Sequence, residues 1–157
     1  MHRLLFVCLG NICRSPTAEA VFAELVRRAG RDHQFHLDSA GTGDWHVGEP
    51  PDPRTRATAQ ALGYPMRHRA RQVSRQDFER FDLVLAMDRQ NHRDLLAMAR
   101  QDQHPRIQLF RSLDDPGSAP DVPDPYYGGE EAFIEVVRIA ERVGARWLER
   151  LGPATGT

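Results

Sequence analysis

Short apolar runs alternate with longer mixed segments along the chain. Runs of consecutive apolar positions are typical of strands buried on both faces of a sheet. We predict strands over residues 3–7, 35–40, 83–86 and 107–110. Helical spacing or start signals predict helices over residues 15–29, 53–62, 74–77, 88–100 and 130–151.

This alternation predicts the fold class. Strands that alternate with helices form parallel sheets through right-handed crossovers, with helices on both faces. We therefore expect a three-layer α/β fold, in which a twisted, four-stranded parallel sheet is flanked by helices. No repeat or long linker divides the sequence, so residues 1–157 are expected to form one domain. Ligands of such sheets bind beyond the carboxyl ends of the strands.

Composition narrows the function classes. The 157 residues are 40% hydrophobic and 27% charged, which is ordinary for a globular domain. A net charge of −1 argues against a general nucleic-acid or anionic-membrane binder. No apolar run reaches the ~20 residues of a membrane span, and the first run is too short for a signal peptide, so we expect a cytoplasmic protein. The chain has no lysine, which excludes Walker-type phosphate loops and Schiff-base chemistry.

The two cysteines, Cys8 and Cys13, stand five positions apart directly after the first predicted strand. A structural zinc site needs more Cys or His ligands than this spacing offers, and the spacing differs from that of thioredoxins. We expect no metal and no cofactor. Two buried free thiols are the simplest interpretation of the pair.

The loop between this strand and the next helix has the composition of an anion site. None of residues 9–14 is proline, so all six amides can surround one oxyanion near the positive end of a helix. Arg14 adds a planar fork suited to phosphate. The same positive field should favour the thiolate form of Cys8. We predict that Ser15 is the N-cap of the helix with Pro16 at its first position, and that Ser15 can hydrogen-bond the Cys8 sulfur.

Read as a whole, the segment from Cys8 to Pro16 resembles the signature of the low-molecular-weight protein tyrosine phosphatases. Cys-x5-Arg alone is a weak signal, but the resemblance covers nearly the whole chain. Further matching segments are residues 38–42, 45–48, 51–54, 68–72, 86–88 and 124–128.

The resemblance implies a role for each matched residue. Cys8 would be the nucleophile, Arg14 the phosphate clamp and Asp124 the general acid, with a phosphocysteine intermediate. Asn11 would hold the loop in a left-handed kink with a hydrogen bond to Ser39. The remaining implied site residues are the phosphate-loop residues Leu9, Gly10, Ile12, Cys13 and Ser15, the cleft walls Trp45, Tyr126 and Tyr127, and a supporting polar pair, His68 and Asp88.

The resemblance also implies ligands. The substrate would be a phosphotyrosine-containing protein, and a bacterial tyrosine kinase or its targets are one candidate. Phosphate and vanadate would inhibit. Cys13 has two interpretations: a small apolar filler, or a partner for a disulfide that protects Cys8, which the resemblance favours.

Plainer interpretations exist for several of these residues. Trp45 could anchor a loop, and Asp124 could be a turn residue, as we expect Asp114 and Asp121 to be. Of the two adjacent tyrosines, we expect one to face the cleft and the other to pack partly beneath it.

Two rival functions can be weighed against this one. An arsenate reductase uses the same loop but needs downstream cysteines, which the chain lacks. A non-catalytic phosphate-binding or redox-sensing module would lose the acid, yet Asp124 is present.

Overall fold

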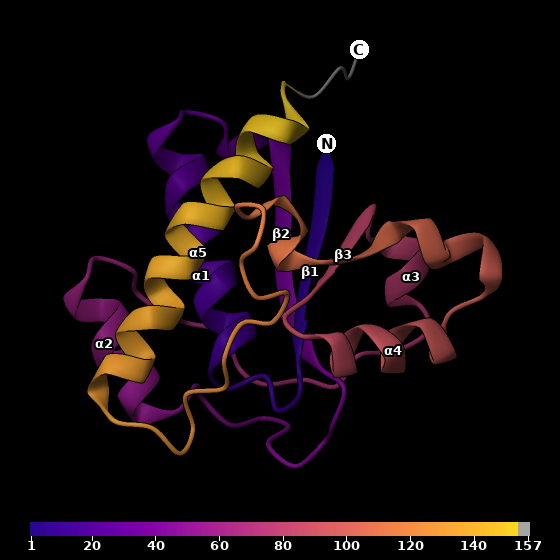
Figure 1. Ribbon diagram of the computed structural model, residues 1–157. Helices are drawn as coiled ribbons and strands as arrows, with labels where there is room; N and C mark the ends of the chain where they lie inside the picture. The colour runs from indigo at the N-terminus through magenta and orange to yellow at the C-terminus, as the bar shows by residue number, and fades with distance from the viewer. Residues whose placement is uncertain (154–157) are drawn as a thin grey trace.

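The computed structural model describes residues 1–153 and contains one sheet of four parallel strands. The strands are β1 (His2–Cys8), β2 (Phe35–Gly41), β3 (Leu83–Ala86) and β4 (Ile107–Leu109), in the order β2-β1-β3-β4. Figure 1 shows the sheet edge-on between two groups of helices. The predicted three-layer α/β class with a four-stranded parallel sheet is confirmed.

Helices cover both faces of the sheet. One face packs against α1 (Arg14–Arg28) and α5 (Glu130–Leu151), and α2 (Pro53–Ala61) lies beyond them. The other face packs against α3 (Asp77–Arg80) and α4 (Arg89–Met98). Within residues 1–153, no helix is both long and apolar enough to cross a bilayer.

Alternation along β1 builds both halves of the core. Leu4 and Phe6 join the cluster under α1 and α5, whereas Leu5 and Val7 join the cluster under α3 and α4. All four side chains are buried, as expected for a central strand that is covered on both faces. β1 therefore delivers Cys8, its last residue, to the carboxyl edge from a rigid position.

Short 3₁₀ turns complete the connections: η1 (Asp32–Gln34), η2 (Gln101–Arg106) and η3 (Phe110–Leu113). Phe110 was predicted to end the last strand but begins η3 instead. Its ring is buried against Phe6, with ring centroids 6.0 Å apart, and its carbonyl accepts the Trp147 Nε1 hydrogen at 2.7 Å. These contacts turn the backbone out of the sheet.

The predicted N-cap of the first helix is wrong. Helix α1 begins at Arg14, so Cys13 is its N-cap and Ser15 lies within the first turn. The Ser15 hydroxyl is instead within hydrogen-bond distance of the Cys8 sulfur and the Asn11 amide. Thr17 Oγ1 donates to the Cys13 carbonyl at 2.7 Å. The helix therefore begins two residues earlier than predicted, and the Ser15 oxygen is used inside the site.

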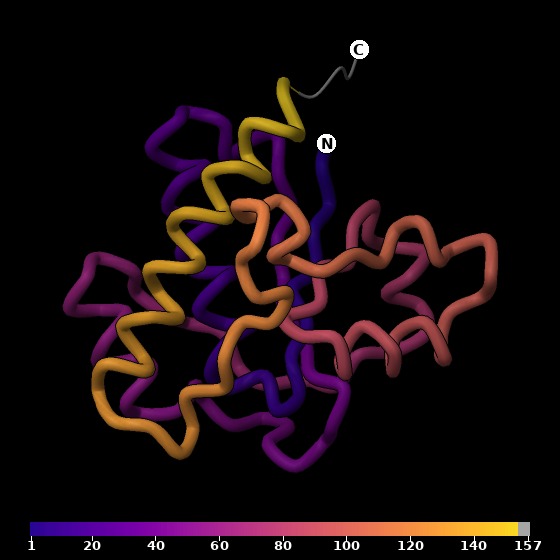
Figure 2. Tube along the Cα trace, viewed as in Figure 1, coloured from indigo at the N-terminus to yellow at the C-terminus, as the bar shows by residue number. Residues whose placement is uncertain are grey.

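Asp114, expected to be a simple turn residue, is an anchor of the segment from residue 114 to residue 129. Figure 2 shows this segment running beside α5 toward the carboxyl edge of the sheet. The Asp114 side chain is 1% exposed and forms ion pairs with Arg111, Arg142 and Arg146. Hydrogen bonds from Arg142 and Arg111 outweigh burial and hold the pKa of Asp114 well below its usual range.

We predict that this anchor makes stability depend on pH. Because the folded-state pKa of Asp114 lies below its unfolded value of about 4, the stabilisation is complete above that pH and is lost as the pH falls below it. Asp114→Asn should lower the free energy of unfolding at pH 7 by about 1–3 kcal/mol. In urea titrations, the difference from wild type should shrink between pH 5 and pH 3. Asp115→Asn, an exposed neighbour in the same segment, serves as the control. An equal loss at every pH would contradict the prediction.

Candidate active site

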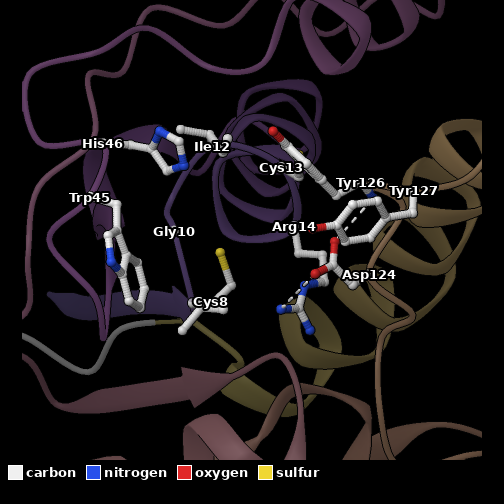
Figure 3. A pocket seen from close by; sticks show the side chains of 11 residues that line it. Cys8, Gly10, Ile12, Cys13, Arg14, Trp45, His46, Asp124, Tyr126 and Tyr127 are labelled. Atoms are coloured by element: carbon white, nitrogen blue, oxygen red, sulfur yellow. Dashed lines mark hydrogen bonds and ion pairs between the residues drawn. The ribbon is translucent and has the colours of Figure 1, made fainter.

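A cavity of about 280 Å³ opens at the carboxyl edge of the sheet, above the end of β1. Figure 3 shows the Cys8 sulfur and the Arg14 guanidinium facing its centre. Residues far apart in the sequence meet here: the loop after β1, the loop after β2 and the segment before α5. The lining residues are Cys8, Leu9, Gly10, Ile12, Cys13, Arg14, Trp45, His46, Asp124, Tyr126 and Tyr127.

Cys8 lies at the floor of the cavity with a hydroxyl beside its sulfur. The residue is 2% exposed, and its Sγ is 3.0 Å from Ser15 Oγ. Asn11 Nδ2 donates to the same Ser15 oxygen at 2.8 Å. Because that oxygen accepts from Asn11, its own hydrogen can point to Cys8. A hydroxyl in this position stabilises negative charge on the sulfur.

Asn11 has the left-handed backbone that the family resemblance implied, with φ of 56°. Its side-chain nitrogen also donates to Ser39 Oγ at 3.0 Å, and its oxygen accepts from the Arg71 backbone N–H at 3.0 Å. Gly41 lies against this kink. A β-carbon there would lie 2.6 Å from the Leu9 carbonyl oxygen and 3.2 Å from the Asn11 backbone nitrogen, so only glycine lets β2 approach the loop so closely.

His68 supports the loop through Asn11. Its Nε2 is 2.7 Å from Asn11 Oδ1, and its Nδ1 is 3.4 Å from Asp38 and 3.6 Å from Glu19. Burial lowers the pKa of His68 and raises that of Glu19 to about 7, so both neutral forms are favoured. The ligand atoms of Glu19, Asp38 and His68 lie within 4.8 Å of one another, but Arg71 already pairs with Asp38. The contact that this cluster makes with the phosphate loop runs through His68 and Asn11.

The predicted pair of His68 and Asp88 does not form. Asp88 belongs to a different network: its Oδ2 accepts from Arg14 Nη1 at 2.6 Å, and its Oδ1 accepts from the Asn91 N–H at 2.7 Å. The second contact makes Asp88 the N-cap of α4. The two residues contact the phosphate loop and its arginine separately: His68 lies in the segment between α2 and α3, and Asp88 lies after β3.

Arg14 is buried and surrounded by acceptors. Besides Asp88, its Nη1 donates to the Val122 carbonyl at 3.2 Å, and its Nη2 lies 3.9 Å from Asp124 Oδ2. Burial alone would lower the pKa of Arg14, but Cys8, Asp88 and Asp124 together raise it. The guanidinium is therefore held in one orientation, with its Nη2 side toward the cavity (Figure 3).

Asp124 lies across the cavity from Trp45 on an exposed loop (Figure 3). Its side chain is 49% exposed, and its Oδ1 accepts the Tyr126 backbone N–H at 3.1 Å. This short turn keeps the other carboxylate oxygen toward Arg14. A carboxylic acid in this position reaches both the floor of the cavity and bulk water.

Aromatic side chains form two walls of the cavity. Trp45 packs over Gly43 on one side, while Tyr126 and Tyr127 stand on the other with ring centroids 5.0 Å apart. Both tyrosines line the cavity, whereas we expected one to face the cleft and the other to pack partly beneath it. Tyr126 rests on the Arg54 guanidinium, 5.2 Å from its ring centroid.

Sequence reasoning missed several supporting residues. Arg54 pairs with Asp52, which is the N-cap of α2 and whose N–H donates to the Ile12 carbonyl. Glu19 was overlooked although it lies one helical turn after Ser15, and His46 was overlooked although it follows Trp45. Helical spacing could have indicated Glu19, but the sequence contains no signal for the contact between Arg54 and Tyr126.

Residues 3–155 match the family model described as low molecular weight phosphotyrosine protein phosphatase. The chain belongs to the low molecular weight phosphotyrosine protein phosphatase family. A low molecular weight protein-tyrosine-phosphatase of Streptomyces coelicolor is 48% identical over 89% of this chain and 87% of its own. The low molecular weight phosphotyrosine protein phosphatase of Homo sapiens is 42% identical over 94% of each chain. The enzyme is thus a hydrolase that removes phosphate from phosphotyrosine.

Solved structures agree with this membership. A protein tyrosine phosphatase of Entamoeba histolytica, crystallised with Hepes in its active site, superposes on this phosphatase with a TM-score of 0.93 and 37% identity, over 96% of this chain and 97% of its own. A structure named as a Drosophila arginine phosphatase superposes with a TM-score of 0.89 and 32% identity, over 98% and 99% of the two chains.

Proposed function

We propose that Cys8 is the nucleophile, Arg14 the phosphate clamp and Asp124 the general acid of this phosphatase. The observation that supports this assignment is the meeting of all three groups at one cavity. A nucleophile below a cluster of donors, with an acid at the rim, is the arrangement that phosphoryl transfer to sulfur requires.

In the first step, the Cys8 sulfur attacks phosphorus and a sulfur–phosphorus bond forms. The bond between phosphorus and the phenolic oxygen breaks, and Asp124 donates a proton to that oxygen. In the second step, water attacks the phosphocysteine, Asp124 accepts a proton from it, and the bond to sulfur breaks. Inorganic phosphate leaves, and the Cys8 thiolate is regenerated. The Ser15 hydroxyl, 3.0 Å from the sulfur, stabilises the thiolate in both directions.

Arg14 and the loop amides bind the phosphoryl oxygens. Because Nη1 is occupied by Asp88 and Val122, the remaining N–H groups of the guanidinium are those available to the substrate. The backbone N–H groups of residues 9–13 complete the cradle, and Leu9, Gly10, Ile12 and Cys13 line the same cavity as Cys8. Inorganic phosphate and vanadate are expected to occupy the same cradle and to inhibit.

The aromatic walls favour an aryl substrate. Trp45 and the two tyrosines bound a cleft in which a phenyl ring can insert with its phosphate on the floor. The physiological substrate is then a phosphotyrosine protein in the cytoplasm, with a bacterial tyrosine kinase or its targets as the candidate partner. We also propose that residues 1–157 form a single domain, since the family model spans nearly all of them.

Cys8→Ser should abolish turnover of aryl phosphates while the protein still folds and binds phosphate or vanadate. Iodoacetate should inactivate the wild type near neutral pH by alkylating Cys8, and phosphate should protect, because both compete for the floor of the cavity. Mass spectrometry of the labelled peptides identifies the site. Equal labelling of Cys8 and Cys13 that phosphate does not change would contradict the assignment.

Asp124→Asn should lower kcat by about 10²- to 10⁴-fold for substrates that need a proton on the leaving oxygen. The leaving phenol of tyrosine has a pKa near 10, so phosphotyrosine and phenyl phosphate belong to this group. The loss should shrink for esters whose leaving group departs readily as an anion. The measurement is kcat for aryl phosphates of graded leaving-group pKa, for both proteins. Equal slopes against leaving-group pKa would exclude Asp124 as the acid.

Cys13 is the candidate partner of Cys8 under oxidation. Burial raises the pKa of Cys13 to about 12, so at neutral pH this side chain is a neutral thiol. A thiolate is the form that attacks an oxidised sulfur. We propose that hydrogen peroxide converts the Cys8 thiolate to a sulfenic acid with release of hydroxide, and that the Cys13 sulfur then displaces the sulfenic oxygen, which leaves as water, to form a disulfide.

Peroxide treatment should therefore yield a Cys8–Cys13 disulfide that dithiothreitol reverses. Its formation from the sulfenic acid should accelerate up to about tenfold for each pH unit, because the thiolate fraction of Cys13 rises at that rate below its pKa. Cys13→Ser should retain activity but lose reversibility. If only sulfinic acid forms on Cys8 of the wild type, Cys13 is a filler.

A further inference from the structure

The loop that bears the candidate acid is fixed to the sheet shortly before it reaches the cavity. The Val122 N–H donates to the Met87 carbonyl at 2.7 Å, and the Val122 carbonyl accepts from Arg14 at 3.2 Å. The preceding carbonyl, that of Asp121, accepts from Arg111 Nη1 at 2.8 Å. The backbone of two successive residues is therefore held, Val122 by the residue after β3 and Asp121 by η3.

The Asp121 side chain adds a second attachment, to the beginning of α4. Its Oδ1 accepts from the Arg89 backbone N–H at 2.9 Å and from Arg89 Nε at 3.2 Å, and its Oδ2 accepts from Arg89 Nη2 at 3.3 Å. Burial would raise the pKa of Asp121, but the contacts with Arg89 lower it. The carboxylate is thus charged at neutral pH, which suits the positive end of a helix.

This ion pair can contribute little to global stability. The Arg89 and Asp121 side chains are 61% and 36% exposed, and pairs with such exposure are weakened by solvent. The position of this ion pair in the fold is more informative than its energy. The residue before Arg89 is Asp88, which holds Arg14 at 2.6 Å, and the third residue after Asp121 is Asp124. The start of α4 therefore holds the phosphate clamp and the acid loop at the same time.

We propose that Asp121, through Arg89, is a positioning residue that sets the place of Asp124 relative to Arg14. The proposal rests on the role of Asp124 stated above. Asp121 does not reach the reacting atoms, so it acts only through the acid. Removing the Asp121 carboxylate lets the loop that carries Asp124 shift. Displacements of about 1 Å at a reacting group can cost up to 10²-fold in rate.

The test compares two substrates. Phenyl phosphate needs a proton on its leaving oxygen, whereas 2,4-dinitrophenyl phosphate releases a stable anion. Asp121→Ala should lower kcat for phenyl phosphate by about 10- to 100-fold and change kcat for the dinitrophenyl ester by about twofold or less. Arg89→Ala should show a smaller selective loss, because the backbone N–H of residue 89 still holds Asp121. Asp121→Asn, which keeps an acceptor for that N–H, should be intermediate.

Matched controls separate this role from a general effect of charge or stability. Asp115→Ala removes an exposed, paired carboxylate from the same loop, and Arg93→Ala removes an exposed arginine from the same helix. Both should leave kcat unchanged for the two substrates. Thermal unfolding of every variant is measured in parallel, and Asp121→Asn provides the comparison should Asp121→Ala fold poorly.

A double-mutant cycle gives the decisive result. Combined with Asp124→Asn, Asp121→Ala should cause no further loss, because the group that it positions no longer donates a proton. Equal losses on both substrates, or an additional loss in the Asp124→Asn background, would show a structural effect and overturn the proposal. If Asp124→Asn is selective for phenyl phosphate and Asp121→Ala is not, the positioning role alone fails. If Asp124→Asn shows no selectivity, the role of Asp124 fails as well.

Discussion

The left-handed backbone of Asn11 is the constraint on which the phosphate loop depends. A non-glycine residue in this conformation costs about 1 kcal/mol, so it persists only where neighbours fix it. Both side-chain N–H groups of Asn11 are used, by Ser15 and Ser39, and its oxygen is shared by His68 and the Arg71 backbone. All the hydrogen-bonding capacity of one buried amide is thereby satisfied. The loop that curls around Cys8 is thus held from β2, α1 and the segment before α3.

Charge balance around Arg14 is the second requirement of the site. Cys8, Asp88 and Asp124 all interact with this one guanidinium, and burial raises the cost of leaving it unpaired. Asp88 occupies one edge of the fork and caps α4, so the arginine cannot rotate away from the cavity. The other edge lies near Asp124, at a distance of 3.9 Å. An arriving phosphate therefore meets a fixed donor and a nearby acid.

How well a contact can be predicted from the sequence depends on how far apart its two residues lie along the chain. The strand, loop and helix from residue 2 to residue 28 follow from local patterns, because consecutive residues there contact one another. Asp124 could be placed only through the family resemblance, and the roles of Asp114 and Asp121 were missed. Both looked like ordinary turn residues, yet their partners lie 28 and 32 positions away. No periodicity or cap signal encodes such contacts. The prediction of Ser15 as N-cap failed for a related reason, since the Ser15 hydroxyl contacts Cys8 and Asn11 instead.

The three groups that we propose as catalytic are held with different rigidity, and their proposed chemistry explains why. Cys8 and Arg14 come from a buried strand end and the first turn of a helix, where packing restrains both side chains. In the proposed mechanism Asp124 meets the leaving oxygen in the first step and the attacking water in the second, and its exposed loop lets water reach it. An exposed loop has few packing contacts, and its position must come from specific bonds instead. Hydrogen bonds before Asp124 and the contact of Tyr126 with Arg54 after it supply that position from both sides. The acid is therefore accessible to solvent and still directed at the floor of the cavity.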